Sequence, residues 1–355
     1  MTRWSLIVLT MFVAGIAPVA VSAGPYEVAG VKLDITAAPE KSEYMLGEPG
    51  YVLFKVANQS DRNLRIMIGG DYRNRLGRPD SFKVEVVGIN AEKVQQPDSG
   101  LQMGGITHAG KLPAKGEYVF RLFLPDWATF EKPGRYTITI RRKLELVPDD
   151  GTDPFRRKTD NIEVRTTATI TIVPLDDAKM GKLIASLGAK IRALKPNHSD
   201  EMAEQMLAAI HDERVIPHWI VLAEKPYYSP RIVACRALGH YKTDEAFETL
   251  KKLLKTTADD VRGSATTLEG DEGCAKAVRH WAIHGIGTSP HPKALPLYWT
   301  FANDPYYGVR LWVVQKAGQL KTPEAHAIIQ KMTSDENEMV RNEAIRYQKL
   351  LAKGN

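Results

Sequence analysis

The sequence predicts two domains of different classes, an antiparallel β-sandwich followed by an α-helical solenoid. Over residues 31–173 apolar side chains alternate with polar ones, the period of half-buried strands. From residue 180 onward the apolar period becomes helical. An Arg followed by a small residue then recurs, with Arg310 and Arg341 lying 31 residues apart. Periods of this length are typical of stacked helix pairs.

The expected strands are short runs in which every second residue is apolar. Examples are Val52, Phe54 and Val56, followed later by Tyr136, Ile138 and Ile140. Turn residues separate the runs, including the Gly-Glu-Pro-Gly of residues 47–50. Six to eight strands in about 140 residues indicate a sandwich over residues 24–174. The charged segment 142–160, which contains Pro148 and Pro154, is expected to be a long exposed hairpin loop.

Residues 175–355 are expected to form the helical domain. Met180, Leu183, Ile184, Leu187 and Ile191 fall on one stripe of a first amphipathic helix. Helix pairs follow, in which the first helices cover about 216–224, 244–255, 292–302 and 323–333, and each leads into a second helix bearing the Arg. The repeated Arg positions are Arg231, Arg262, Arg279, Arg310 and Arg341. The unit with Arg262 and Arg279 is irregular, and residues 266–273 are interpreted as an excursion from the solenoid.

This half resembles HEAT-repeat proteins in the short form common in bacteria. The matching residues are Val-Arg-x-x-Ala at 261–265, 278–282 and 340–344, with Ala-Leu-Gly at 237–239 and Thr-Asp-Glu-Ala at 243–246. Pro230 and Val313 depart from the pattern. The resemblance implies a surface for protein partners and no particular reaction.

Two sequence segments of the first half resemble secreted bacterial immunoglobulin-like domains. They are residues 44–49 (YMLGEP), which precede a strand ending at Asn58, and residues 132–138 (KPGRYTI). The domain has no Cys, so the resemblance is to relatives without a disulfide. It implies an immunoglobulin-like sandwich.

Residues 1–23 have the pattern of a signal peptide. Arg3 supplies a positive charge, an apolar run follows, and Val21-Ser22-Ala23 fits a cleavage site before Gly24. An uncleaved membrane anchor is the alternative. We therefore expect an exported protein, periplasmic or extracellular, without stable membrane insertion after the leader is removed.

Cys235 and Cys274 are the two cysteines of the chain. Their offset from the repeated Arg separates them by roughly 13 Å along parallel helices, whereas a disulfide needs Cα atoms within about 7 Å. We expect two unpaired, mostly buried thiols.

The composition gives no sign of an enzyme or of a nucleic-acid-binding protein. The formal charge of +6 is spread over both halves without a run of Lys or Arg. No triad, phosphate loop or paired carboxylate set is recognisable, and no cofactor is expected. We expect a monomer.

Two tyrosine pairs are the candidate partner-binding residues. Tyr227 and Tyr228 are echoed by Tyr306 and Tyr307, and each pair opens a second helix. Together they could form an aromatic ledge for a peptide or glycan. The alternative is that one Tyr of each pair packs on Trp219 or Trp299 of the preceding helix.

His280 and His284 have the i, i+4 spacing of two metal ligands, and His240 or His291 could supply a third. Trp281 stands where a metalloprotease would have Glu. The alternative, which we favour, is that both histidines pack between repeats, so no metal is expected.

Three functions remain open at this stage. The leading hypothesis is an exported, non-catalytic binding or scaffolding protein whose solenoid holds a protein partner, on the face formed by second helices or on the tyrosine edge. The others are glycan or cell-surface adhesion through the sandwich, and a lyase-type enzyme of the HEAT-like fold.

Overall fold

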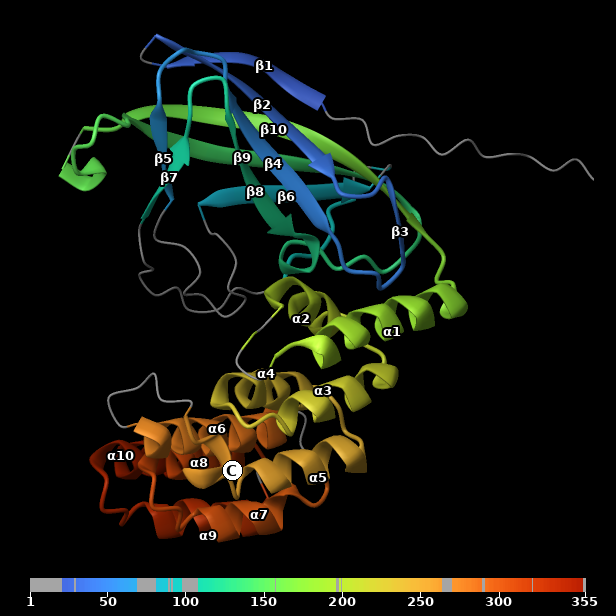
Figure 1. Cartoon of the computed structure of the whole chain (residues 1–355). Helices are drawn as coiled ribbons and strands as arrows, with labels where there is room; N and C mark the ends of the chain where they lie inside the picture. The colour runs from blue at the N-terminus through green and yellow to red at the C-terminus, as the bar shows by residue number, and fades with distance from the viewer. Residues whose placement is uncertain are drawn as a thin grey trace, which may run out of the picture. The chain divides into compact units, whose positions relative to one another are not determined.

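The computed structural model describes residues 21–28, 30–68, 81–88, 90, 92–97, 108–156, 158–195, 198, 200–263, 270–288, 291–320 and 322–353. Most of the expected leader lies outside these residues. The chain divides into two compact units, Met1–Asp177 and Ala178–Asn355. The first is built of strands and the second of helices (Figure 1). The prediction of a β domain followed by an α-helical repeat domain is confirmed.

The first unit contains two β-sheets (Figure 1). One has the strand order β1-β2-β4-β8, and the other β3-β10-β9-β5-β7, with β6 also paired to β9. The strands are β1 Val21–Val28, β2 Val31–Pro39, β3 Glu43–Met45, β4 Tyr51–Asn58, β5 Leu64–Ile68, β6 Phe82–Gly88, β7 His108–Leu112, β8 Glu117–Phe123, β9 Gly134–Pro148 and β10 Asp160–Val173. The pairs are antiparallel except β3 with β10, which is parallel.

The apolar alternation of the sequence becomes the core of this unit. In β2 and β4 every second side chain is buried, as the period of two requires. Phe54 of β4 and Phe120 of β8 come from one sheet and meet Phe82 of β6 from the other. The Phe82 ring lies edge-on to both, at centroid distances of 5.2 Å. The two sheets therefore share one core, as in a sandwich.

The prediction of an exposed loop from residue 142 is wrong in its first part. Residues 142–148 continue β9, and Leu144 and Leu146 are buried. Arg142 is only 5% exposed, and its guanidinium lies 4.4 Å from the Phe82 ring and 4.3 Å from the Phe120 ring. The electron-rich faces of the two rings attract the guanidinium. Arg142 therefore occupies a core position although it is charged.

The second unit consists of helix pairs. The helices are α1 Asp177–Ala193, α2 Glu201–Ala208, α3 Ile216–Ala223, α4 Tyr228–Leu238, α5 Asp244–Leu253, α6 Gly270–Thr288, α7 Ala294–Phe301, α8 Tyr307–Leu320, α9 Pro323–Met332 and α10 Glu338–Lys353. The second helices of the repeats pack in succession, α4 on α6, α6 on α8 and α8 on α10 (Figure 1). Among the described helices, none combines the length and apolarity needed to cross a membrane.

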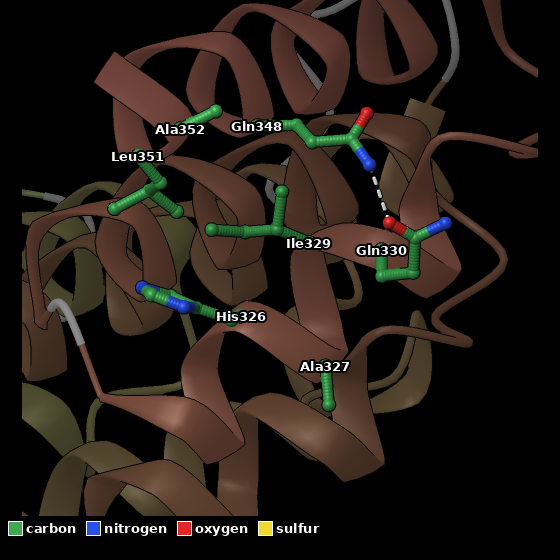
Figure 2. A pocket seen from close by; sticks show the side chains of 7 residues that line it. All are labelled: His326, Ala327, Ile329, Gln330, Gln348, Leu351 and Ala352. Carbon is green, nitrogen blue, oxygen red and sulfur yellow. Dashed lines mark hydrogen bonds between the residues drawn. The ribbon is translucent and has the colours of Figure 1, made fainter. Parts of the chain in front are cut away.

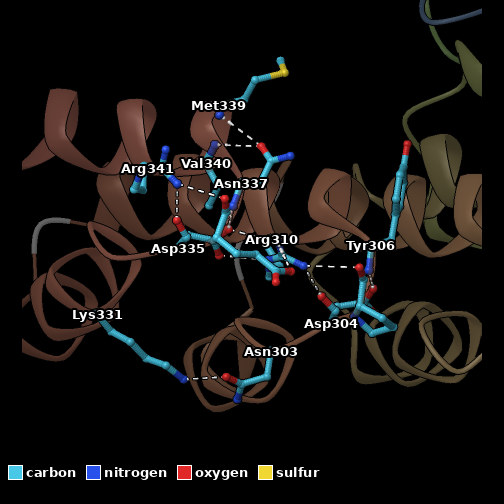
Figure 3. Close-up of polar contacts among 12 residues, drawn as sticks. Asn303, Asp304, Tyr306, Arg310, Lys331, Asp335, Asn337, Met339, Val340 and Arg341 are labelled. Carbon is cyan, nitrogen blue, oxygen red and sulfur yellow. Dashed lines mark hydrogen bonds and ion pairs between the residues drawn. The ribbon is translucent and has the colours of Figure 1, made fainter.

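The repeated Arg residues join one turn of the solenoid to the next (Figure 3). Arg310 is 5% exposed and donates from Nη1 to the Asp304 carbonyl of its own turn at 2.8 Å. It also binds Asp335 of the next turn with two bonds of 2.9 Å. Arg341 then donates to the carbonyl of Asp335 at 2.6 Å. The pair of Arg310 with Asp335 therefore links two successive repeats.

The same arrangement extends toward the N-terminal repeats. Arg231 donates to the Lys225 carbonyl at 2.7 Å and reaches the Thr256 hydroxyl at 3.5 Å. Arg279 donates to the Thr256 carbonyl at 3.1 Å and lies 3.4 Å from an Asp304 oxygen. Each of these Arg residues thus donates to a carbonyl in the turn that follows a first helix.

The prediction that Arg262 lies in a second helix is wrong. Arg262 follows the short 3₁₀ helix Asp259–Val261, and its side chain is 77% exposed beside Asp259. Arg279 in α6 takes the repeat position instead. The spacing of 31 between Arg231 and Arg262 is therefore coincidental. Residues 266–269 of the expected excursion lie outside the described part, and its remainder, Gly270–Gly273, begins α6.

A glycine lies eight residues after Arg231, Arg279 and Arg310, and it allows the second helices to approach closely. A Cβ on Gly239 would lie 2.7 Å from Cα of Gly285 on α6. A Cβ on Gly287 would lie 2.3 Å from the stem of Lys316 on α8, and one on Gly318 would lie 2.2 Å from the ring of Tyr347 on α10. In each case the residue that the added Cβ would meet is the sixth residue after the Arg of the next repeat. The recurring Gly is thus a packing requirement between neighbouring repeats.

Cys235 and Cys274 form no disulfide and are fully buried, as predicted. Cys235 of α4 points at the backbone of α6, with its sulfur 3.9 Å from the carbonyl of Val278. Burial raises the pKa of Cys235 far above its usual value.

Candidate functional site

Aromatic and basic side chains line the second helices where these remain partly exposed. We define the aromatic–basic strip as Arg236 of α4, Trp281 and His284 of α6, Trp312 and Lys316 of α8, and Arg346 and Tyr347 of α10. Arg236 and Arg346 are exposed, and the other five are half-buried. Trp281 and Trp312 both follow their repeat Arg by two residues. They therefore occupy the same repeat position on adjacent helices.

The members of the strip contact one another in sequence along α4, α6 and α8. The guanidinium of Arg236 lies 5.4 Å from the Trp281 ring, whose centroid lies 5.3 Å from that of His284. His284 meets the Trp312 ring edge-on at 4.3 Å, and the Lys316 ammonium lies 5.2 Å from the same ring. A cation thus lies over each tryptophan, within the distance at which the attraction is significant.

On α10 the strip ends in a stacked Arg–Tyr pair. The Arg346 guanidinium lies 4.4 Å from the Tyr347 ring. Its Nε and Nη2 each donate to a carboxylate oxygen of Glu343 at 2.7 Å. Arg346 therefore shares its charge with Glu343, whereas Arg236 has no carboxylate at ion-pair distance among the described residues.

The histidines are packing residues of the strip, the alternative favoured above. His280 accepts a 2.7 Å hydrogen bond on Nε2 from the indole N–H of Trp312, and His284 lies between Trp281 and Trp312. Among the described residues no group of three His, Cys, Asp or Glu is placed to hold a metal. His291 lies elsewhere, stacked on Phe247 at 4.4 Å.

The surroundings of His284 are positively charged. Its pKa is lowered to about 4, chiefly by burial and further by the charges of Lys316, His280, Arg236 and His240. The pKa of His280 is also lowered, mainly by burial. Both imidazoles are therefore neutral near pH 7, and the strip's positive charge comes from Arg and Lys.

The predicted tyrosines begin α4 and α8, but they are not equivalent. Tyr306 is half-buried, its ring lies 5.2 Å from Tyr307 and 6.3 Å from His280, and the Lys276 ammonium lies 5.9 Å from it. Through His280, Tyr306 thus adjoins the strip. Tyr307 is 38% exposed.

The other tyrosine pair begins α4. Tyr227 is the residue before the helix, Tyr228 is its first residue, and both are half-buried. The tryptophans proposed as their packing partners differ in exposure, since Trp219 is fully buried and Trp299 is 38% exposed beneath the Lys331 ammonium.

The strip is not among the sites expected from the sequence, in which Trp281 stands only as a departure from a metalloprotease pattern. The equal distance of Trp281 and Trp312 from their repeat Arg was the signal that could have found them, because equivalent repeat positions lie on one face of a solenoid.

A pocket of about 350 Å³ lies between α9 and α10 (Figure 2). Its lining residues are His326, Ala327, Ile329, Gln330, Gln348, Leu351 and Ala352, and Gln348 donates to the side-chain oxygen of Gln330 across it. Apart from His326 the lining has no titratable side chain, so the pocket offers no acid–base pair.

Comparisons with known proteins agree with the repeat architecture. A family model of HEAT repeats matches residues 271–347, which contain α7, α8, α9 and most of α6 and α10. No curated protein of similar sequence was found. Among solved structures, WR4, a C. elegans MSP family member, aligns with 38% of this chain and 91% of its own, at 14% identity and a TM-score of 0.18. At that score the likeness supports no conclusion.

Proposed function

We propose that the protein is an exported, non-catalytic binding module that holds a protein partner on the aromatic–basic strip. The observation that carries this is the run of partly exposed rings and cations across successive second helices. Trp, Tyr and Arg are the residue types in which binding energy concentrates at protein interfaces. HEAT repeats provide extended surfaces of this kind for partners.

The test of this function compares two tryptophans, Trp281 on a second helix and Trp299 on a first helix. Full-length protein would be used to capture partners from an envelope extract, with Trp281→Ala as the strip variant and Trp299→Ala on α7 as the matched control. We expect capture of one protein to fall at least tenfold for Trp281→Ala, since truncating a central aromatic costs on the order of 2 kcal/mol of binding. Loss with Trp299→Ala alone would place the interface on the first helices instead.

The tyrosine pairs form a second candidate surface for the same function. The double change Tyr227→Ala and Tyr306→Ala tests it in the same assay, with circular dichroism as the check on folding. Loss of the partner with Trp281 intact would assign binding to the helix starts. Capture that survives both sets of changes would favour adhesion through the sandwich.

Export rests on the leader pattern of residues 1–23. Cleavage before Gly24 would remove the pairs of Val21 with Ala37 and Ser22 with Thr36, and would leave β1 paired to β2 from Pro25 onward. Mass spectrometry of the protein from an envelope fraction should therefore find Gly24 as the first residue. An intact chain confined to the cytoplasm would contradict export.

For the sandwich, an immunoglobulin-like fold is proposed from the two sequence segments quoted above. Residues 44–49 precede β4, which ends at Asn58, and residues 132–138 lead into β9. Both segments thus occupy the strand-entry positions that the resemblance requires.

A further inference from the structure

The charge and geometry of the aromatic–basic strip indicate which kind of peptide segment it binds. We infer that it binds an extended acidic peptide segment, whose carboxylates pair with Arg236 and Lys316 while its backbone crosses the second helices over Trp281 and Trp312. This inference rests on the function proposed above and adds the chemistry of the partner.

The exposed and half-buried cations give the strip a positive charge. Arg236 and Lys316 stand at the two sides of His284, and both oppose its protonation. Arg346 extends the positive side chains onto α10, where Glu343 offsets one charge. The half-buried rings between the cations exclude water, which strengthens an ion pair formed there relative to one in bulk solvent. A carboxylate is the group of opposite charge that such a surface attracts.

The positions of the cations over the tryptophan rings also favour a peptide with carboxylates. The Arg236 guanidinium lies over the Trp281 ring, and the Lys316 ammonium lies over the Trp312 ring. The indole N–H of Trp312 is already used by His280. Because these cations cover ring faces on which nucleic-acid bases would have to stack, the surface favours single carboxylates over a strand of bases. Stacking also restricts the Arg236 side chain, so less entropy is lost when it binds an anion.

The distance between the cations sets the spacing of the carboxylates in the peptide. Packed helices lie about 8–10 Å apart, so Arg236 on α4 and Lys316 on α8, with α6 between them, are roughly 16–20 Å apart. An extended peptide advances about 3.3 Å per residue, and its carboxylates should therefore be about five or six residues apart. A third carboxylate about three residues further on would reach Arg346 on α10.

The test uses short fluorescent Gly/Ser peptides with glutamates at this spacing and the full-length protein. Fluorescence anisotropy should show binding by the glutamate peptide that weakens with salt, and none by the matched peptide with glutamine. Arg236→Glu with Lys316→Glu should reduce the affinity at least tenfold, on the order expected for reversed charges in an interface. Lys252→Glu on α5, whose side chain is 75% exposed, is the matched control and should have no effect.

A second measurement keeps the inference testable if the double variant fails to fold. In the wild-type protein, NMR titration of His284 should show its pKa rising when the glutamate peptide is bound, because carboxylates near it favour the imidazolium. An unchanged His284 titration with saturating peptide would overturn the inference. Tighter binding of a single-stranded oligonucleotide of equal charge would also overturn it. If the peptides do not bind but Trp281→Ala still loses its captured protein, the proposed function stands and the acidic partner is wrong.

Discussion

Gly239 of α4 and Gly285 of α6 meet backbone to backbone. A Cβ built on Gly239 would lie 2.7 Å from Cα of Gly285, and one on Gly285 would lie 2.6 Å from the carbonyl oxygen of Cys235. Neither neighbour is the end of a flexible side chain, so an added methyl group would have to move a helix. The contact fixes how closely α4 packs on α6.

Replacing Gly285 by Ala should therefore destabilise the helical unit by about 1–3 kcal/mol, the usual cost of overpacking. Gly181→Ala in α1 is the control, since its Cβ would meet only the end of the Arg214 side chain, at 3.3 Å. That change should be neutral or stabilise by up to about 1 kcal/mol through helix propensity. Urea unfolding followed by circular dichroism compares the two variants, and equal stability would contradict the close approach.

Breaking the Arg310–Asp335 pair should cost more than breaking an exposed pair. Both side chains are 6% exposed, so Arg310→Ala leaves the Asp335 carboxylate buried without its guanidinium. The expected loss is about 3–5 kcal/mol. Lys55→Ala, which breaks the exposed pair with Glu117, should cost less than about 1 kcal/mol. Thermal unfolding of the two variants tests this, and a small loss at Arg310 would mean that the turn-to-turn ladder is dispensable.

Acid should destabilise the helical unit through His284. Its folded pKa is about 4, below the ordinary value of 6.5, so the unfolded chain binds the proton more readily. The contribution of His284 to the free energy of unfolding is therefore greatest above pH 6.5, and it decreases as the pH falls toward about 4. The lowered pKa values of His218 and His280 act in the same direction. In His284→Gln, unfolding free energy measured across this pH range should fall less steeply than in the wild type; parallel curves would refute the assignment.

The thiols should be unreactive in the folded protein. Cys235 and Cys274 are both 0% exposed, and burial raises the pKa of Cys235, which removes the reactive thiolate. An aromatic disulfide reagent should label neither thiol under native conditions and both after denaturation without a reductant. Labelling of fewer than two thiols in the denatured, unreduced protein would indicate a disulfide.

The local patterns of the sequence predicted most of the fold. The alternation in β2 and β4, the stripe of α1 and the recurrence of Arg279, Arg310 and Arg341 each depend on neighbours within one element or one repeat. Such periods are visible in a chain without its coordinates. Arg262 shows the limit, because a matching spacing placed it in a helix that the chain does not form there.

The sequence by itself determined the two-domain order, the solenoid repeat and the burial of its cysteines, because periodicity alone decides which face of an element is apolar. The tertiary structure decided which side chains of different elements contact one another. Only the packing of α6 on α8 brings Trp312 to His280 and His284. Only the packing of the two sheets buries Arg142 against Phe82 and Phe120. These contacts join residues far apart in the chain, and their geometry depends on how closely helices and sheets approach, which no local pattern records.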